Sequence, residues 1–373
     1  MAYITNKEIK AIIKANNKQI KELNKKNSSY TKEDYITKMK NDDNIVEFDD
    51  LKTYFFTDNG VVKAVNGVTF EVPKNSIVGI VGESGCGKSV TSLSLMRLLQ
   101  GPSGQIVDGS IRFKASDDVV YDIAKMPFKE MYNIRGKDIT MIFQEPMTSL
   151  NPVFTIGNQL DEVSFLHNGF NKEQAKERSI EMLNLVGIPD PEMVYKKYPH
   201  ELSGGMRQRV MISMALAANP KLIIADEPTT ALDVTTQAEI IELLKDIKNE
   251  SNSGIILITH DLGVVAEIAE KVVVMYFGQV VEECSVNEFF DNAMHPYSKA
   301  LLDAMPDNFD GRFKSIEGNV PNLYEKVEGC PYYKRCLESG VECTKENSEM
   351  IDLGDGHKVR CIKFKNLAKG DVK

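Results

Sequence analysis

The stretch Gly82–Ser89 combines three glycines with a lysine and a serine at the spacing of a loop that binds phosphate groups. The glycines allow backbone conformations that other residues avoid, so successive N–H groups can converge on phosphate oxygens at the positive end of a following helix. In such a loop Lys88 would contact the β- and γ-phosphates, and the Ser89 hydroxyl would bind Mg²⁺. The sequence therefore predicts a phosphate-binding loop.

The flanking sequence supplies the strand and the helix that this loop needs. The apolar run Ile77–Val81 predicts a buried parallel strand, and Val90–Leu99 places Leu93, Met96 and Leu99 on one helical face. The order of strand, glycine loop and helix is far more specific than a lone glycine pair.

A second apolar strand, Leu222–Pro228, ends in Asp226 and Glu227. One carboxylate at such a strand end can hold Mg²⁺, and the other can orient or deprotonate a water that attacks the γ-phosphate. His260 follows a further strand, Ile255–Thr259. A lone histidine there is more often structural, but its place in this ordered set favours a functional role.

Two polar sites lie in the sequence between the phosphate loop and the strand Leu222–Pro228. The strand Thr140–Phe143 ends at Gln144, whose amide is well placed to reach a ligand in the crevice at the carboxyl end of a sheet. A helix is predicted to open within Leu202–Arg209, with Ser203 as its N-cap. Two consecutive glycines after Ser203 would let a second anion approach the amides of this helix start.

Upstream of the phosphate loop, Ile45–Phe56 and Val61–Val72 predict an antiparallel strand pair joined at the hairpin signal Asn59-Gly60. An aromatic side chain here could stack on a purine ring, with Phe55 the first candidate and Tyr54 the second. The alternative is that these rings are simply part of the core.

The chain has 373 residues, which predicts a main domain with a smaller appendage. Its formal net charge of −9 argues against sequence-independent binding of nucleic acid as the main task. No run approaches the ~20 apolar residues that span a bilayer, and the first residues lack the apolar core of a secretion signal. We therefore expect a cytosolic location.

The first 43 residues are rich in Lys, Asn and Ser and form a basic arm. Its apolar residues Ile9, Ile12, Ile13, Ile20 and Leu23 fall near one helical face, which predicts a short amphipathic helix followed by a linker. Such an arm could contact anionic lipid or a partner subunit, or it could be a solvated extension.

In order, these segments resemble the Walker A, Q-loop, signature, Walker B, D-loop and H-loop motifs of ABC-type ATPases. The matching residues are Gly82–Ser89, Gln144, Leu202–Gln208, Leu222–Glu227, Ala231–Asp233 and His260. The resemblance covers roughly Ile45 to Cys284. It implies an α/β fold: a P-loop core with a RecA-like mixed sheet, an antiparallel β subdomain and an α-helical subdomain.

The resemblance also implies the role of each residue, because two such domains clasp ATP between the Walker A loop of one and the signature of the other. The implied catalytic residues are Lys88, Gln144, Glu227 as general base, and His260 at the γ-phosphate. The implied Mg²⁺ site is Ser89, Gln144 and Asp226. The implied nucleotide-binding residues are Tyr54, Phe55, Gly82, Glu83, Ser84, Gly85, Cys86, Gly87, Lys88, Ser89, Val90, Gln144, Asp226 and His260. The signature residues implied to act on the partner's ATP are Leu202, Ser203, Gly204, Gly205, Met206 and Gln208, and Asp233 would couple the two sites.

Four of the six cysteines lie near the C-terminus, at Cys330, Cys336, Cys343 and Cys361. Four thiolates suit either a tetrahedral zinc or an iron–sulfur cluster. The spacing lacks the tight Cys-x₂-Cys pairs usual for structural zinc, which favours iron–sulfur and leaves zinc as the alternative. The other two, at positions 86 and 284, are expected to be buried filler residues.

The tail is similar to the C-terminal extension of the ATPase subunits of oligopeptide/dipeptide permeases. The similarity rests on His295–Leu302 and the cysteine set, with support from Met147–Pro152 and Pro228–Asp233. In that family the cysteines hold a [4Fe–4S] cluster where they are present. The expected division of the chain is a basic arm at 1–43, an ABC ATPase domain at 44–285 with a helical insert at about 145–219, and an extension at 286–373.

The resemblance implies an ATPase that powers uptake of oligopeptides or dipeptides at the cytoplasmic face of a bacterial membrane. Expected partners are a second ATPase subunit, a paralogue or else a second copy, two transmembrane permease subunits and, indirectly, an extracellular substrate-binding protein. Nickel or another small solute is the alternative cargo. A soluble ABC ATPase acting on nucleic acid or ribosomes is the alternative class.

Overall fold

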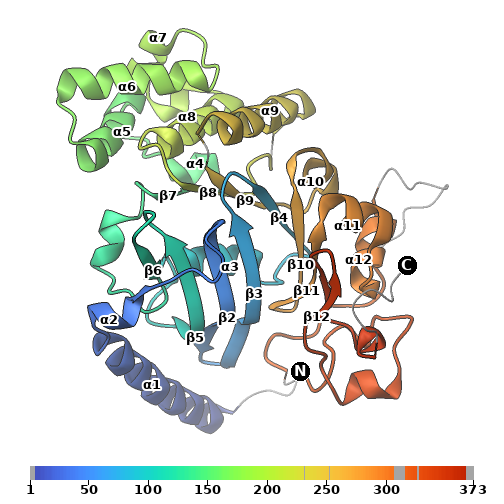
Figure 1. The fold of residues 1–373 in the computed structure, drawn as a ribbon. Coiled ribbons are helices and arrows are strands. Elements are labelled where there is room, and N and C mark those ends of the chain that lie inside the picture. Colours follow the sequence, from blue (N-terminus) through green and yellow to red (C-terminus); the bar gives the residue numbers. More distant parts are fainter. Residues whose placement is uncertain (1–4, 231, 252, 306–315, 326, 367–373) are drawn as a thin grey trace. The chain divides into compact units, whose positions relative to one another are not determined.

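The computed structural model describes residues 5–230, 232–251, 253–305, 316–325 and 327–366 (Figure 1). The chain divides into two compact units, each with its own core. Unit 1 comprises Met1–Glu71, Val78–Phe128 and His260–Lys373, and unit 2 comprises Val72–Ile77 and Lys129–Thr259.

The first sheet of unit 1 has five strands. Their order is β1 (Ile36–Thr37), β6 (Val120–Asp122), β5 (Gly104–Lys114), β2 (Asn44–Thr57) and β3 (Gly60–Pro73). The rings of Phe48 and Phe70 are buried and stack with their centroids 4.4 Å apart, which fixes the inner face of β2 and β3. The predicted hairpin is confirmed to within one residue at each strand end.

Unit 1 also contains strands of a second sheet, among them the strand before the phosphate loop. β4 (Ile77–Val81) is buried at every residue and pairs in parallel with β10 (Lys271–Tyr276). β10 pairs antiparallel with β11 (Gln279–Ser285), and the edge is formed by β13 (His357–Val359) and β12 (Ile351–Gly354). The continuous apolar run of β4 thus marks a strand covered on both faces, as predicted. The β12–β13 hairpin is too short to have given a sequence signal.

Among the described residues of unit 1, five α-helices have eight or fewer residues. They are α2 (Lys32–Tyr35), α3 (Lys88–Leu95), α10 (Leu262–Ile268), α11 (Val286–Asn292) and α12 (Pro296–Asp303). The prediction that the helix after the phosphate loop reaches Leu99 is wrong. Arg97 has a φ of 52°, in the left-handed region that cannot continue an α-helix, so α3 ends at Leu95.

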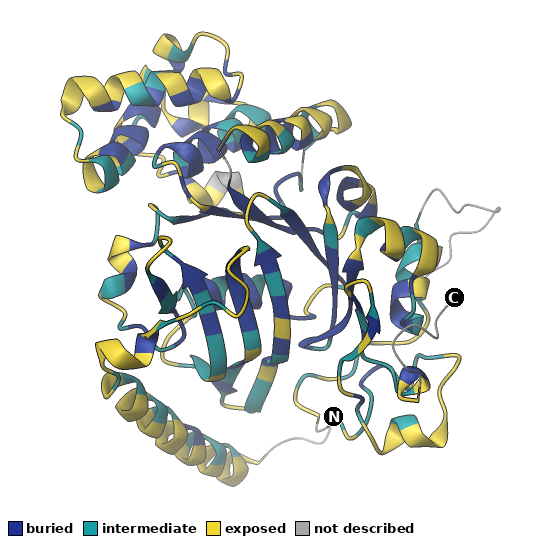
Figure 2. Cartoon of the chain, viewed as in Figure 1, coloured by how far each residue is buried: buried dark blue, intermediate teal, exposed yellow. Residues whose placement is uncertain are grey.

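The N-terminal arm forms a longer element than predicted. α1 (Asn6–Ser28) begins with a capping box between Thr5 and Glu8 and is exposed along most of its length (Figure 2). Asn16 is its buried residue, and the side-chain amide donates to the carbonyl of Thr57 at 2.8 Å. The linker prediction is wrong in part, because β1 pairs antiparallel with β6 and extends the sheet.

Unit 2 contains three parallel strands that follow one another in the order β9 (Gly254–Ile258), β8 (Leu222–Asp226) and β7 (Ile139–Ile142), and every residue in them is buried. The helices of this unit are α4 (Pro146–Ser149), α5 (Ile156–Val163), α6 (Lys172–Leu185), α7 (Pro191–Lys196), α8 (Gly204–Leu216) and α9 (Val234–Ser251). The helical periodicity predicted between positions 156 and 218 is confirmed. Each parallel strand ends beside polar residues, so the loops after β7 and β8 carry the chemistry of this unit.

Candidate functional site

The phosphate loop of unit 1 is shaped by glycines that no other residue could replace without strain. Gly82 has a φ of 143° and Gly87 a φ of 105°, and a Cβ on Gly87 would collide with the carbonyl oxygen of Ala64. Gly87 is the residue that precedes α3, so the loop delivers its amides to the start of that helix.

Lys88 lies within this loop and is only 6% exposed. Its Nζ donates to the carbonyl of Gly82 at 2.7 Å and to the carbonyl of Glu83 at 3.3 Å. The ammonium group therefore lies inside the loop, hydrogen-bonded to its backbone, and this is the position from which such a lysine contacts a bound phosphate. Cys86 is buried beside it, burial raises the pKa of its thiol, and the residue fills space as predicted.

The two candidate stacking residues lie on β2 and differ in their contacts. The Tyr54 hydroxyl donates to Asn66 Oδ1 at 2.8 Å, and Lys63 Nζ lies 5.6 Å from the centre of the Tyr54 ring. Phe55 is half-buried and faces Gly104, where a Cβ would lie 3.0 Å from the ring. Both residues are thus partly buried, and Tyr54 is in addition hydrogen-bonded through its hydroxyl.

In unit 2 the amide of Gln144 and the carboxylate of Glu227 meet. Gln144 Nε2 donates to Glu227 Oε2 at 2.7 Å, and Thr230 Oγ1 donates to the same oxygen at 3.0 Å. Asp226 directly precedes Glu227 and is the last residue of β8, where it is buried. The residues predicted at the ends of β7 and β8 are therefore brought together.

Glu227 has a φ of 48°, a left-handed conformation that is uncommon for any residue other than glycine. Its N–H donates to the carbonyl of Ile258 at 2.8 Å, which holds this conformation in place. Backbone strain of this kind is common at functional sites. The sequence gives no indication that Glu227 adopts it.

The signature segment forms the start of α8. Ser203 is its N-cap and accepts from the N–H of Met206 at 3.3 Å, as predicted. Ser203 and Gly204 are exposed, and Gly205 and Met206 are partly exposed, whereas Leu202 and Gln208 are buried. The Gln208 amide donates to the carbonyl of Pro228 at 2.7 Å, so this side chain joins α8 to the loop that follows Glu227.

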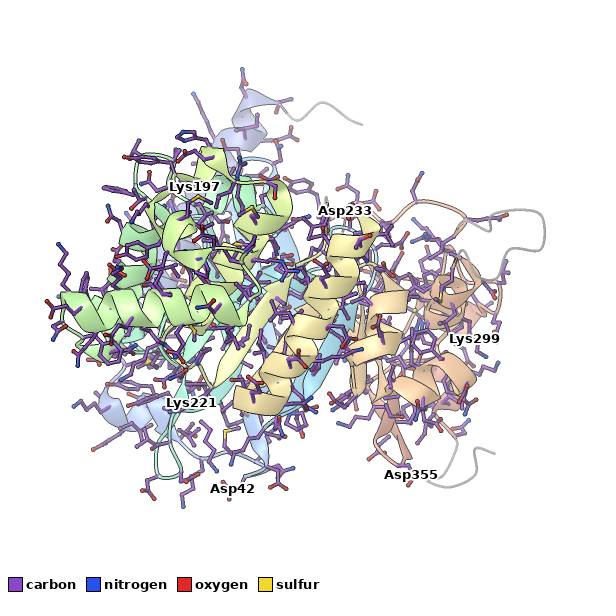
Figure 3. All side chains as sticks on the ribbon, turned by 90° about the horizontal axis from the view of Figure 1, so that it is seen from above. Asp42, Lys197, Lys221, Asp233, Lys299 and Asp355 are labelled. Carbon is purple, nitrogen blue, oxygen red and sulfur yellow. The ribbon has the colours of Figure 1, made fainter. Side chains whose placement is uncertain are left out.

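Asp233 lies at the start of α9 (Figure 3), where it accepts from the backbone N–H and the hydroxyl of Thr236 at 3.0 and 2.7 Å. These two hydrogen bonds lower the pKa of its carboxyl group. Ala231, the first residue of the predicted D-loop, lies outside the described residues. His260 is exposed and belongs to unit 1.

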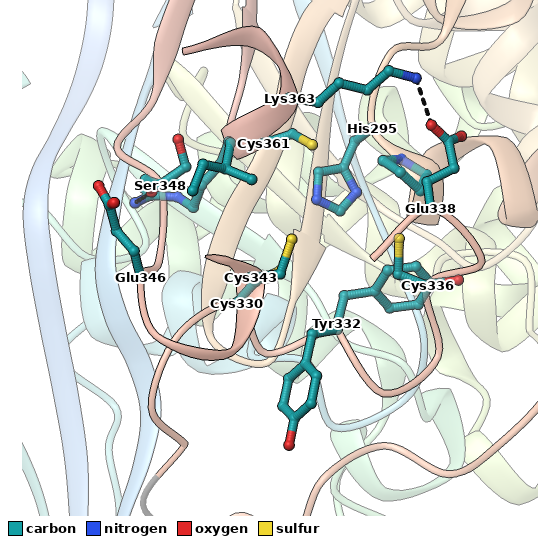
Figure 4. A pocket seen from close by; sticks show the side chains of 14 residues that line it. His295, Cys330, Tyr332, Cys336, Glu338, Cys343, Glu346, Ser348, Cys361 and Lys363 are labelled. Atoms are coloured by element: carbon teal, nitrogen blue, oxygen red, sulfur yellow. Dashed lines mark hydrogen bonds and ion pairs between the residues drawn. The ribbon is translucent and has the colours of Figure 1, made fainter. Parts of the chain in front are cut away.

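The four C-terminal cysteines line one cavity of about 40 Å³ (Figure 4). The cavity is bounded by Cys330, Cys336, Cys343 and Cys361, together with neighbours that include His295 and Tyr332. Burial raises the pKa of the Cys330 thiol to about 11 and raises the pKa of Cys336 and Cys361 as well. A bound metal would reverse this, because coordination holds a cysteine as its thiolate.

A second group of potential metal ligands, Glu282, Cys284 and His357, was missed by sequence reasoning. Its ligand atoms lie within 4.8 Å of one another, and all three residues are buried. Glu282 already accepts from the N–H of Met294 at 2.6 Å, from that of His295 at 3.0 Å and from His357 Nε2 at 2.7 Å. This arrangement is a hydrogen-bonded pair that ties β11 to β13. Cys284 is a buried filler, as predicted.

No helix in the described part of the chain is both long enough and apolar enough to cross a membrane.

Comparisons with known proteins agree with this geometry. A family model described as "ABC transporter" matches residues 65–230, and one described as "Oligopeptide/dipeptide transporter, C-terminal region" matches residues 281–343. The oligopeptide transport ATP-binding protein AppD of Bacillus subtilis is 47% identical, over 86% of this chain and 97% of that protein. The dipeptide transport ATP-binding protein DppD of the same organism is 46% identical, over 85% of this chain and 94% of that protein.

Among solved structures, the dimeric ATP-binding cassette MJ0796 bound to ADP and Pi is similar, with a TM-score of 0.57 and 26% identity over 65% of this chain and 98% of that chain. cbiO1 from Clostridium perfringens has a TM-score of 0.56 and 26% identity, over 67% of this chain and 92% of that chain. The expected ABC ATPase fold is confirmed. The chain belongs to the ATP-binding subunits of the oligopeptide/dipeptide family of ABC transporters.

Proposed function

We propose that this chain hydrolyses ATP to power the uptake of oligopeptides or dipeptides through a multi-subunit membrane importer. The observation that carries the proposal is the hydrogen bond between Gln144 and Glu227, which holds a carboxylate at the end of β8 in a chain that has every other motif of the family. The cargo class is supported by relatives named for oligopeptide and dipeptide transport and by the C-terminal family region.

Each residue has a chemical task in this proposal. The loop amides and Lys88 bind the β- and γ-phosphates, and Phe55 or Tyr54 stacks on the adenine ring. Ser89, Gln144 and Asp226 hold Mg²⁺, directly or through water. Glu227 accepts a proton from the attacking water, and His260 contacts the γ-phosphate.

A second ATPase subunit completes each site in this proposal. The exposed turn Ser203–Met206 at the start of α8 offers backbone amides to an anion on a partner. Asp233 then links the two sites. The partner is a paralogue, with a homodimer as the alternative.

The surface for the two transmembrane subunits lies between Gln144 and Leu166. Four large apolar side chains are exposed there, namely Val153, Phe154, Phe165 and Leu166, the first 70% exposed and the last 69%. A segment that exposes four large apolar side chains is a candidate interaction site. The chain would thus be peripheral at the cytoplasmic face of a bacterial membrane, with the extracellular substrate-binding protein reached only through the permease.

The C-terminal cysteines hold a [4Fe–4S] cluster in this proposal. The four thiols line one cavity, which supports a metal group shared between them. Their spacing in the sequence, without a Cys-x₂-Cys pair, favours the iron–sulfur cluster over zinc.

The proposed division of the chain is a basic arm at 1–43, an ATPase domain at 44–285 with a helical insert at about 145–219, and an extension at 286–373. Reconstitution of the chain with its permease in vesicles tests the function. ATP-dependent uptake of a labelled di- or oligopeptide is expected, and it should stop in the Glu227→Gln variant. Uptake of ⁶³Ni²⁺ without peptide uptake would overturn the cargo, and stimulation of ATP hydrolysis by nucleic acid alone would overturn the transport role.

A further inference from the structure

Glu83, the second residue of the phosphate loop, is held at three of its groups. Its N–H donates to the Tyr297 hydroxyl at 2.8 Å, and its carbonyl accepts from Lys88. Its carboxylate receives both arms of the Arg335 guanidinium, at 2.6 and 2.9 Å. Two of these three partners come from the C-terminal region, far along the chain from the loop.

Arg335 is built into its position. Its side chain is only 3% exposed, and its Nε donates to the carbonyl of Glu317 at 3.0 Å. The guanidinium also lies 5.8 Å from the ring centres of Tyr276 and Tyr332. A planar guanidinium fixed in this way presents two parallel N–H groups to one carboxylate, which is its strongest pairing geometry.

Tyr297 is fixed in the same way. It is fully buried, and its ring packs against Tyr276 and Tyr332 at centroid distances of 4.7 and 5.3 Å. Burial raises the pKa of its hydroxyl, so the group stays a neutral phenol that can accept from the Glu83 N–H. The aromatic cluster therefore delivers a hydroxyl and a guanidinium to the same loop residue.

Two physical effects follow for a triphosphate bound at this loop. Glu83 lies next to Gly82 and two residues before Gly85, and both glycines have positive φ, so the segment depends on outside contacts to keep one shape. In addition, a carboxylate beside the phosphates would repel them, and a paired guanidinium offsets that charge.

We propose that Arg335 and Tyr297 are positioning residues of the ATP site. They hold Glu83 so that the phosphate loop keeps its binding shape and the negative charge of the Glu83 carboxylate stays paired with the guanidinium. This inference rests on the proposed function, because it requires ATP to bind at this loop. It assigns the C-terminal region a task at the nucleotide, in addition to the metal site proposed at the cysteines.

The test measures the KM for ATP, kcat and the Kd of a fluorescent ATP analogue in the full-length protein. Arg335→Gln is expected to raise KM and Kd roughly tenfold, the scale of losing one charge-assisted pair, with a smaller change in kcat. Arg335→Lys should recover part of the affinity, because it restores the charge without the fork. Tyr297→Phe, which removes only the hydroxyl, should raise KM by a few fold. Lys334→Ala, at the exposed neighbouring position, is the matched control.

A double variant separates repulsion from general damage. Since Glu83→Gln removes the negative charge, Glu83→Gln with Arg335→Gln should bind ATP more tightly than Arg335→Gln alone. Additive losses in this cycle, or an unchanged KM in both Arg335→Gln and Tyr297→Phe, would overturn the inference. If Arg335→Gln fails to fold, Tyr297→Phe and Arg335→Lys decide the question. Absence of ATP binding by the wild-type protein would overturn the proposed function instead.

Discussion

Gln144 and Glu227 come from the ends of two neighbouring parallel strands and share a hydrogen bond of 2.7 Å. β7 and β8 are aligned from Ile139 opposite Leu222 to Ile142 opposite Ala225, so both strands end at the same edge of the sheet. The adjacency of the two side chains therefore follows from strand register.

We expect Glu227→Gln to slow ATP turnover by roughly 10²–10⁴-fold, the usual effect of losing a general base, while ATP binding is retained. The substitution keeps the size of the side chain and an oxygen that can accept from Gln144. Steady-state hydrolysis and equilibrium binding of a fluorescent nucleotide measure the two effects. Glu242→Gln, at an exposed position of α9, is the control, and near-normal hydrolysis by Glu227→Gln would remove the residue from this role.

Lys88→Ala is expected to lose most of its affinity for ATP, because the buried ammonium group is the cation that the loop offers to the phosphates. Isothermal calorimetry with Mg-ATP measures the loss. Lys14→Ala on the exposed part of α1 should bind as the wild type does. Equal affinities of the wild type and Lys88→Ala would contradict the assignment of the loop.

The signature turn gives a prediction about assembly. With ATP present, the Glu227→Gln protein should form a stable dimer, either with itself or with its paralogue, and adding Ser203→Arg should prevent this by placing a bulky side chain at the exposed start of α8. Light scattering coupled to gel filtration distinguishes the two states. A dimer that forms equally well with Ser203→Arg would exclude the turn from the nucleotide interface.

The cysteine cavity gives a prediction about metal content. Protein purified without oxygen should contain iron and sulfide in equal amounts, and Cys336→Ser or Cys361→Ser should reduce both. Zinc without sulfide would establish the alternative. Cys284→Ser, outside the cavity, is the control for loss of a buried thiol.

The Glu282–His357 pair predicts a pH-dependent stability. Burial favours neutral His357, but the hydrogen bond and charge of Glu282, with Glu288, outweigh it and raise the His357 pKa above 6.5. The stability that protonated His357 adds to the fold is fully present below pH 6.5 and is lost as the pH rises through the raised pKa. Glu282, whose pKa is held below 4.5 despite burial, loses its contribution only as the pH falls through that lowered value.

The free energy of unfolding of His357→Gln should therefore fall furthest below that of the wild type at about pH 6, and the difference should shrink at about pH 9. Denaturant titrations at the two pH values measure it. A difference that is the same at both would mean that the histidine acts through packing alone. Lys358→Gln, at the neighbouring position of β13, is a suitable control.

The sequence predicted those parts of the site whose chemistry depends on local order. The glycines of Gly82–Ser89, the N-cap Ser203 and the acids after β8 each carry a short-range signal, and all were found where expected. The family resemblance placed Gln144 and Glu227 in one site, but the direct hydrogen bond between them, and the pairing of Glu83 with Arg335, could not be predicted. These contacts link residues 83 and 252 positions apart, and nothing in the local sequence specifies them.

The same distinction explains the errors. The linker prediction for the arm missed β1, because two residues give no periodicity and the strand exists only through its pairing with β6. The end of α3 depends on a single residue, Arg97, that adopts a left-handed backbone without being a glycine. Tertiary context outweighs local preference in both places.

The left-handed backbone of Glu227 separates what folding would favour from what the reaction requires. An L-residue in this conformation lowers the free energy of unfolding by on the order of 1 kcal/mol, and glycine, which has no Cβ, would remove that penalty. A chain optimised only for thermal endurance would thus carry glycine at position 227. Neither Glu227→Gly nor Glu227→Ala should hydrolyse ATP, but Glu227→Gly should melt at the higher temperature. The difference between the two melting temperatures would measure what any side chain costs in this backbone conformation.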